Sequence, residues 1–449
     1  MRKCSILIFN KVYVLFFCVL YFAAVVFLFS CHKEAAQHKP DPPPPPPPPE
    51  LPNIVLILSD DVGYEVPTID GGKSYATPFI DQMANAGMRF TQCHAAPTCS
   101  PSRFMLLTGK YSFRNYRLSG ALDLDQRTIA NMLHDAGYAT CISGKWQLDG
   151  GDNSIKTFGF DAYSVFQAYL TETDFRYKNP LIYQAGNYLP DSVTLGKYGE
   201  DWYADYAMNF MDSVSKTKNP FFVYYAMANC HEPFSPTPDD AEFDAWVPKE
   251  NKSDPKFFPS MANYMDKKVQ AVVQKIKSLG IENKTLILFA GDNGTPNTIY
   301  SLFNDTLVQG GKSTTIEYGT HVPLIAYWPG HIAPGSVNND LIDFTDFFPT
   351  IAEVAGVQKL TKYGILDGVS FAPRLQGQPG NPRQWIFLHY QQGGITTRYV
   401  QNAQYKFYEG TAKFYNIVND IAEDHPLKDL DSTQSYYRRQ FQQVLSLMH

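Results

Sequence analysis

Short, continuous apolar runs recur along the chain between segments with helical spacing, and this alternation constrains the fold more than any other feature. The runs lie at 53–58, 138–143, 220–228, 285–290 and 322–327. Runs this short and this rich in Ile, Val and Leu are typical of strands buried on both faces of a sheet. The segments with helical spacing lie at 77–87, 127–137 and 261–279. Strands alternating with helices predict an α/β fold, with a mostly parallel or mixed central sheet sandwiched by helices.

The pattern changes after about residue 345. A helix is expected at 347–356, and shorter runs of alternating polarity then follow at 385–390, 396–400, 405–409 and 414–416. Alternation with a period of two predicts half-buried strands, here a small antiparallel sheet. We therefore predict a main α/β domain at 53–345 and a smaller C-terminal subdomain at 346–449.

The first 30 residues have the features of an export signal. Arg2 and Lys3 precede an almost unbroken apolar stretch at 12–29, and basic residues before an apolar core are typical of signal peptides. Cys31 follows Ser30 in a pattern that resembles the lipobox of bacterial lipoproteins, in which the cysteine becomes the lipidated first residue. The alternative is a plain transmembrane anchor, since 18 apolar residues nearly span a bilayer. Both interpretations place the remaining chain outside the cytoplasm.

We predict an exported bacterial lipoprotein, periplasmic or on the cell surface, held at a membrane by its N-terminal lipid. Residues 31–52 then form the lipidated N-terminus and a linker with eight consecutive prolines, which in the polyproline II form would span about 25 Å. The formal net charge of −6 implies no broad basic surface, and no nucleic-acid partner is expected. Any anionic substrate must be held by a few local cations.

Two acidic pairs follow two of the predicted strands. Asp60 and Asp61 come directly after the first strand, and Asp292 and Asn293 follow the strand at 285–290. In open α/β sheets the carboxyl ends of the strands face the ligand crevice. Carboxylates gathered there repel one another unless a cation lies between them, and oxygen ligands favour Ca²⁺, with Mg²⁺ possible. Each pair taken alone is also compatible with an ordinary turn.

The segment from Cys99 to Arg103 (CSPSR) is the strongest local signal. Pro101 suits the first turn of a helix that runs to Gly109. Cys99 would then lie at a helix N-terminus, where backbone N–H groups favour an anion. A thiolate nucleophile is one interpretation, and a buried, unreactive cysteine is the other.

With the LTGK sequence that follows at 107–110, this segment resembles the signature of type I, formylglycine-dependent sulfatases of the alkaline phosphatase superfamily, as found in bacterial arylsulfatase-like lipoproteins. The resemblance implies that a formylglycine-generating or maturase enzyme oxidises Cys99 to formylglycine. One hydroxyl of the hydrated aldehyde would attack sulfur, and the other would later expel sulfate. The family's calcium ligands would be Asp60, Asp61, Asp292, Asn293 and the modified residue 99.

The same resemblance assigns the remaining site residues. Arg103 would hold the formylglycine, and Lys145, in a Gly-Lys-Trp segment, would contact the sulfate. His231, in His-Glu-Pro, and Lys312, in Gly-Lys, would contact the sulfate ester. We therefore expect Cys99, Arg103, Lys145, His231 and Lys312 to be catalytic, and a substrate site formed by Lys145, Gln147, His231 and Lys312. The implied activity is hydrolysis of a sulfate ester on a small molecule or a glycan.

The chain departs from the family pattern at three positions. Gln147 occupies the place of a histidine that takes a proton from the formylglycine hydroxyl, and glutamine cannot act as a base. Tyr318 replaces a glycine, and His321 replaces an arginine, in the segment that follows Lys312. With Gln147, either another group takes this proton, or turnover is slower, or the pocket is specialised. Tyr318 and His321 predict a different local loop shape and leave the position of Lys312 unchanged.

Three alternative functions fit parts of the pattern. The first is a phosphate or phosphonate ester hydrolase of the same superfold. The second is a catalytically impaired, sulfatase-derived lipoprotein that binds glycans, which only Gln147 favours. The third is a membrane-tethered structural protein, which has no need of acids at two strand ends. Aromatic residues at 163–188 could stack on sugars or pack in an inserted loop, so the sequence names no particular substrate.

Overall fold

The computed structural model describes residues 50–118, 120–171, 176–248 and 250–448. The predicted signal at 1–30, the lipidated Cys31 and almost all of the linker lie outside the described residues. The described residues from 51 onward form one compact unit. Within the described part of the chain, no helix is both long enough and apolar enough to span a bilayer. The boundary between 345 and 346 stays a prediction.

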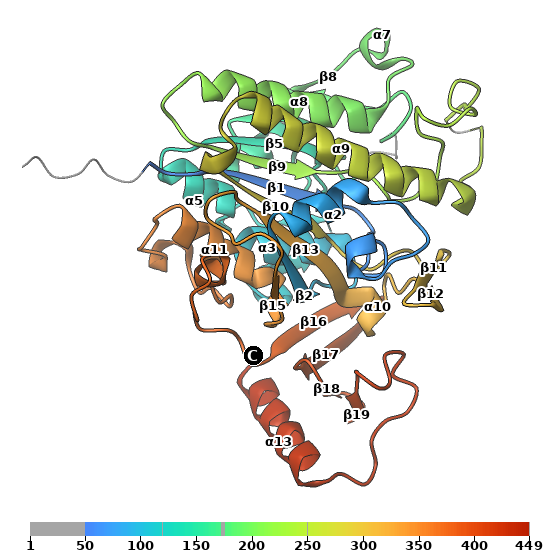
Figure 1. Cartoon of the computed structure of the whole chain (residues 1–449), viewed down its shortest axis with the longest axis vertical. Helices are drawn as coiled ribbons and strands as arrows, with labels where there is room; N and C mark the ends of the chain where they lie inside the picture. The colour runs from blue at the N-terminus through green and yellow to red at the C-terminus, as the bar shows by residue number, and fades with distance from the viewer. Residues whose placement is uncertain (1–49, 119, 172–175, 249, 449) are drawn as a thin grey trace, which may run out of the picture. The chain divides into compact units, whose positions relative to one another are not determined.

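An eleven-stranded mixed sheet forms the centre of this unit, and its middle is parallel (Figure 1). The parallel strands, in spatial order, are β10 (Thr285–Gly291), β1 (Asn53–Ser59), β9 (Phe221–Ala226), β5 (Ala139–Lys145) and β6 (Ala162–Phe166). On the other side of β10, β13 (His321–Tyr327) pairs antiparallel to β10. Strand β2 (Met88–His94) then pairs antiparallel to β13. The predicted α/β class with a mixed central sheet is confirmed.

Successive side chains of a strand point to opposite faces of the sheet. Each face therefore has its own apolar core, which is covered by its own set of helices. On β1, Ile54, Leu56 and Leu58 belong to one buried cluster, and Val55 and Ile57 belong to the other. The first cluster includes α3 (Cys99–Thr108), α5 (Ile129–Asp135) and α11 (Phe347–Val354). The second includes α2 (Pro78–Asn85), α8 (Gly199–Ser215) and α9 (Phe258–Ser278).

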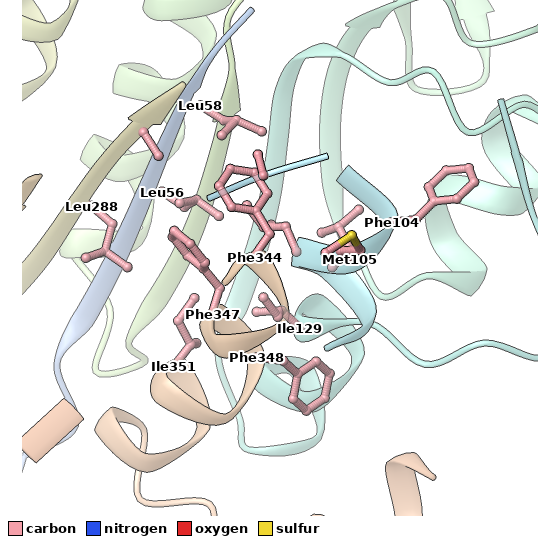
Figure 2. Packing of buried hydrophobic residues seen from close by; sticks show 14 of the residues in the cluster. Leu56, Leu58, Phe104, Met105, Ile129, Leu288, Phe344, Phe347, Phe348 and Ile351 are labelled. Carbon is pink, nitrogen blue, oxygen red and sulfur yellow. The ribbon is translucent and has the colours of Figure 1, made fainter. Parts of the chain in front are cut away.

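Figure 2 shows the first of these cores at close range. Leu56, Leu58 and Leu288 extend from β1 and β10 towards Phe344 and Phe347, and all five side chains are fully buried. Met105 of α3 lies in the same cluster. The C-terminal half of the helix that begins at Cys99 is therefore held in this core by apolar packing.

The C-terminal sheet is antiparallel, as the alternating runs predict. Its strands are β16 (Ile386–Gln392), β17 (Ile395–Gln401), β18 (Tyr405–Tyr408) and β19 (Phe414–Asn416), paired in chain order. Gly393 and Gly394 join the first two strands with φ of 57° and 80°. A two-residue hairpin turn of this kind requires positive φ, which glycine adopts without steric cost.

Several elements have no counterpart in the sequence-based prediction. Among them are the core strand β6, strand β2, helix α8 and the C-terminal helix α13 (Ser432–Leu447). Helix α13 is mostly polar and buries only Phe441 and Leu445, so its apolar stripe is too sparse to detect. Strand β2 places only part of its side chains in the core, unlike the continuous apolar runs at the centre of the sheet.

Candidate active site

The parallel strands bring distant residues together at one edge of the sheet. Ser59, the last residue of β1, pairs with Gly291, the last residue of β10. Asp60 and Asp292 therefore leave the sheet side by side. Lys145 is the last residue of β5, two strands from β1. Because all these strands are parallel, their carboxyl ends form the crevice where α/β proteins bind ligands.

Three fully buried carboxylates lie at the centre of the crevice: Asp60, Asp61 and Asp292. The backbone N–H of Asp61 donates to Oδ1 of Asp292 at 3.0 Å, and Nδ2 of Asn293 donates to Oδ1 of Asp61 at 2.8 Å. The backbone of Asp61 has φ of 60°, in the left-handed region that residues other than glycine rarely adopt. The two strand ends are thus linked directly through the residues predicted to bind metal.

Each buried carboxylate has its own cation. Nζ of Lys145 lies 2.7 Å from Asp60, and Nζ of Lys312 lies 2.6 Å from Asp61. Nη2 and Nε of Arg103 donate to Oδ2 of Asp292 at 2.7 and 3.0 Å. Pairing and hydrogen bonding offset the large cost of removing these charges from water.

The shared field shifts the pKa values of the carboxyl groups in opposite directions. Burial alone would raise the pKa of Asp60, but the charges of Lys145, His231 and Arg103 hold it well below its ordinary value. Burial and the neighbouring charge of Asp60 raise the pKa of Asp292 to about 6. Two carboxylates this close disfavour simultaneous ionisation unless further positive charge is present.

The crevice suits a hard divalent cation. Oδ1 of Asp60 and Oδ1 of Asn293 are buried without a hydrogen-bond partner among the described residues, and a buried acceptor of this kind needs a compensating partner. Asp60, Asp61 and His231 offer ligand atoms within 4.8 Å of one another. His231 was not expected in this set. The oxygens of Asp292 are engaged by Asp61 and Arg103, but carboxylate oxygens have further lone pairs for a metal.

Cys99 is the first residue of α3, as predicted, and is almost fully buried. Cys99 lies close enough to the guanidinium of Arg103 and to the ammonium of Lys312 to interact with both electrostatically. Nε2 of Gln147 donates to Sγ of Cys99 at 3.2 Å. The structure therefore places the predicted nucleophile Cys99 close to Arg103, Lys312 and the atypical Gln147.

His231 follows β9 and lies at the rim of the carboxylate cluster. Its Nε2 is 3.9 Å from Oδ2 of Asp61. Burial, together with the positive charge of Arg176, lowers the pKa of His231 to about 4 despite the opposing charges of Asp61 and Asp60. The structure thus brings all the residues predicted for the site to one crevice.

Arg176 is a component of the site that sequence reasoning missed. Its side chain is 1% exposed, and Nη1 lies 3.6 Å from Oδ2 of Asp60. The guanidinium also lies over the ring of Phe166, 5.2 Å from its centroid. The only available signal was a single arginine within the aromatic segment at 163–188, and no motif distinguishes it.

The two departures in the segment after Lys312 have structural partners. The carbonyl oxygen of Tyr318 packs closely against Gly294. A Cβ atom added at position 294 would lie only 1.9 Å from this oxygen. The ring of His321 stacks on Tyr64 with centroids 3.9 Å apart, and its Nε2 contacts the carbonyl of Thr91 at 3.0 Å. This loop therefore packs directly against the turn that contains Asp292 and Asn293.

Comparison with known proteins agrees with this geometry. The sequence model of a family described as Sulfatase matches residues 52–357. The chain belongs to the sulfatase family. A second model, described as N-sulphoglucosamine sulphohydrolase, C-terminal, matches residues 311–446 of this sulfatase. The predicted membership of the sulfatase family is therefore confirmed, and with it the enzymatic class.

Named relatives cover most of this sulfatase. Rat (Rattus norvegicus) arylsulfatase G is 30% identical over 84% of this chain and 82% of its own. Mouse (Mus musculus) N-acetylgalactosamine-6-sulfatase is 30% identical over 73% of this chain and 67% of its own. The crystal structure of Ps i-CgsB in complex with k-i-k-neocarrahexaose is 25% identical, with a TM-score of 0.73, over 88% of this chain and 92% of that one. The enzyme is therefore a sulfatase that hydrolyses sulfate esters.

Proposed function

We propose that this sulfatase removes sulfate from a sulfated carbohydrate through a formylglycine at position 99 and a bound Ca²⁺, for which Mg²⁺ could substitute. One observation carries the proposal: Lys145, Lys312 and Arg103 each pair with a different buried carboxylate around Cys99. Three buried charge pairs beside one cysteine are not expected in a purely structural core, because removing charges from water costs free energy.

The cationic side chains bind and orient the ester. A sulfate monoester has one negative charge, and further charge develops on the bridging oxygen as the ester bond breaks. Lys145 and Lys312 are positioned to neutralise this charge in a crevice with little water, where electrostatic stabilisation is most effective. Arg103 lies one helical turn after residue 99 on α3 and would orient the modified side chain.

His231 is the candidate proton donor to the leaving alcohol. An alkoxide leaves poorly unless it is protonated, and imidazole is the usual group for this role. Burial lowers the pKa of His231 to about 4, but a bound sulfate ester places a negative charge nearby and favours the protonated ring. His231 would then hold a proton at Nε2, the nitrogen that faces Asp61.

The bound cation would be held by Asp60, Asp61, Asp292 and Asn293, with residue 99 as a further ligand. The two unpartnered oxygens of Asp60 and Asn293 support this assignment. A divalent cation there would supply positive charge for the sulfate and for the modified side chain. Cys99 becomes the nucleophile only after oxidation to formylglycine, so a formylglycine-generating or maturase enzyme is a required partner.

A carbohydrate substrate is supported by the named relatives, which include an N-acetylgalactosamine-6-sulfatase and a structure in complex with a neocarrahexaose. It is also consistent with the predicted export of the chain. An enzyme anchored by a lipid on Cys31, and separated from the membrane by the proline linker, would meet glycans in the periplasm or at the cell surface. This location remains part of the proposal.

The mass of the peptide containing residue 99 tests the mechanism. Protein purified from its native host should show formylglycine at this position, and the unmodified thiol would reject the mechanism. Sulfate and phosphate release, measured side by side from matched esters, tests the reaction. Faster phosphate release would favour the phosphate or phosphonate ester hydrolase. Glycan binding without release of either ion would favour the impaired, glycan-binding lipoprotein.

A further inference from the structure

A hollow beside Lys312 contains an acidic side chain that the proposed function leaves without a role. The hollow has a volume of about 160 Å³, and its lining includes Asp61, Glu232, Asn297, Thr298, Lys312 and Ser313. Asp61 and Lys312 belong to the sulfate site, so the hollow opens directly onto it. The part of the substrate that remains after sulfate leaves must occupy space next to these two residues.

Backbone hydrogen bonds fix the walls of this hollow relative to the nucleophile. The N–H of Lys312 donates to the carbonyl of Thr295 at 3.0 Å, which ties the Lys312 loop to the turn after β10. The N–H of Ser313 donates to the carbonyl of Pro97 at 2.8 Å, two residues before Cys99. The hollow is therefore a preformed part of the site, as ligand pockets commonly are.

The charge of the lining is unfavourable for a second anion. Lys312 is the only basic side chain among the described residues that line the hollow, and it already pairs with Asp61 at 2.6 Å. Glu232 is exposed and has no ion-pair partner among the described residues. Asn297 and Thr298 are exposed and uncharged, with amide and hydroxyl groups that suit sugar hydroxyls.

We propose that Glu232 selects sugars whose only negative charge near the reacting centre is the sulfate to be removed. The substrate class would be a neutral or amine-bearing sugar with one sulfate, while a neighbouring carboxylate or second sulfate would be rejected. This inference rests on the proposed function, because it assumes that the sulfate occupies the site of Lys145 and Lys312. The carboxylate of Glu232 and a second anionic group on the bound sugar would repel each other. At the distance of about one sugar ring, this repulsion changes the preference for the singly sulfated sugar by about tenfold.

The test compares matched pairs of hexosamines that differ by one additional sulfate on the same ring. The enzymes are the wild type, Glu232→Gln, Glu232→Lys and the control Glu353→Gln, which removes an exposed carboxylate on α11 outside the hollow. The measured quantity is the ratio of kcat/KM for the singly and doubly sulfated sugars. We expect the wild type and Glu353→Gln to prefer the singly sulfated sugar by about tenfold or more. Glu232→Gln should lose most of this preference, and Glu232→Lys should reverse it.

Failure of the inference can be distinguished from failure of the proposed function. Sulfate release with the same ratio in the wild type and Glu232→Gln would overturn the role of Glu232 and leave sulfatase activity intact. If no sugar of the panel releases sulfate, the carbohydrate substrate is overturned. Calorimetric titration with the same pairs then tests Glu232 by itself. Equal affinity of the wild type for both members of each pair would overturn the inference.

Discussion

The side-chain nitrogen of Gln147 donates a hydrogen bond to the sulfur of Cys99 across 3.2 Å. The side-chain oxygen of Gln147 is buried with no hydrogen-bond partner among the described residues, and its backbone has φ of 56°. A left-handed backbone at a non-glycine residue is uncommon and occurs often at functional sites. Gln147 therefore directs its amide at the predicted nucleophile, at the position where the family pattern has a histidine.

Gln147→His should turn over the native substrate at least as fast as the wild type. Imidazole can accept the proton that sulfate release requires, whereas a glutamine amide cannot. Steady-state kcat and single-turnover measurements would separate sulfate release from ester cleavage. Gln378→His, at an exposed position, controls for the addition of a histidine. Lower activity of a correctly folded Gln147→His variant would show that glutamine is adapted to this pocket.

Removal of divalent cations should lower both sulfate release and the unfolding temperature. A ligand that binds only the folded state stabilises it by about 2.7 kcal/mol at one hundred times its Kd. Chelator-treated protein should regain the lost stability on addition of Ca²⁺, as measured by calorimetry. Asn293→Ala removes one unpartnered buried oxygen and should weaken this recovery. Melting curves that are identical with and without Ca²⁺ would contradict the metal site.

Lys406→Met should destabilise the protein by about 3–5 kcal/mol, because it leaves two buried carboxylates without their cation. Nζ of Lys406 is fully buried, 2.9 Å from Glu423 and 3.7 Å from Glu317. The contact with Glu317 joins the C-terminal sheet to the segment that follows Lys312. Urea unfolding measures the effect, and Lys413→Met at an exposed position should change stability by less than about 0.5 kcal/mol. Equal stability of the two variants would refute this role.

His94 should make stability depend on pH. Burial lowers the pKa of His94 to about 3 from an ordinary value of 6.5, against the opposing charge of Glu317. The unfolded chain therefore takes up a proton below pH 6.5, while the folded chain stays neutral at this residue until pH approaches 3. Its contribution to stability is present above pH 6.5 and is lost as pH falls, by about 1.4 kcal/mol per pH unit within this window.

Urea unfolding of the wild type and His94→Gln between pH 7 and pH 4 measures this contribution. The variant should lose less stability than the wild type as the pH falls. His425→Gln is the matched control, since the side chain of His425 is 88% exposed, and it should follow the wild type. Parallel pH profiles for the wild type and His94→Gln would show that His94 contributes nothing to acid sensitivity.

The local sequence was sufficient for most of the central strands, though not for β6, and for the order of site residues along the chain. Apolar runs such as 53–58 predict buried strands because hydrophobic burial on both faces leaves a continuous apolar pattern. Asp60 and Asp292 could be expected to meet because parallel strands end at the same edge of a sheet. The motif around Cys99 is local, so its helix could be predicted before any contact was known.

Tertiary structure alone decided the contacts between residues far apart in the chain. Arg176 approaches Asp60, and Gln147 approaches Cys99, only because separate segments pack against the same edge of the sheet. The raised pKa of Asp292 and the lowered pKa of Asp60 depend on burial and on distances to several charges. The periodicity of apolar residues and the ends of strands depend on local sequence, so the sequence by itself determined them. Long-range side-chain contacts depend on how the whole chain packs.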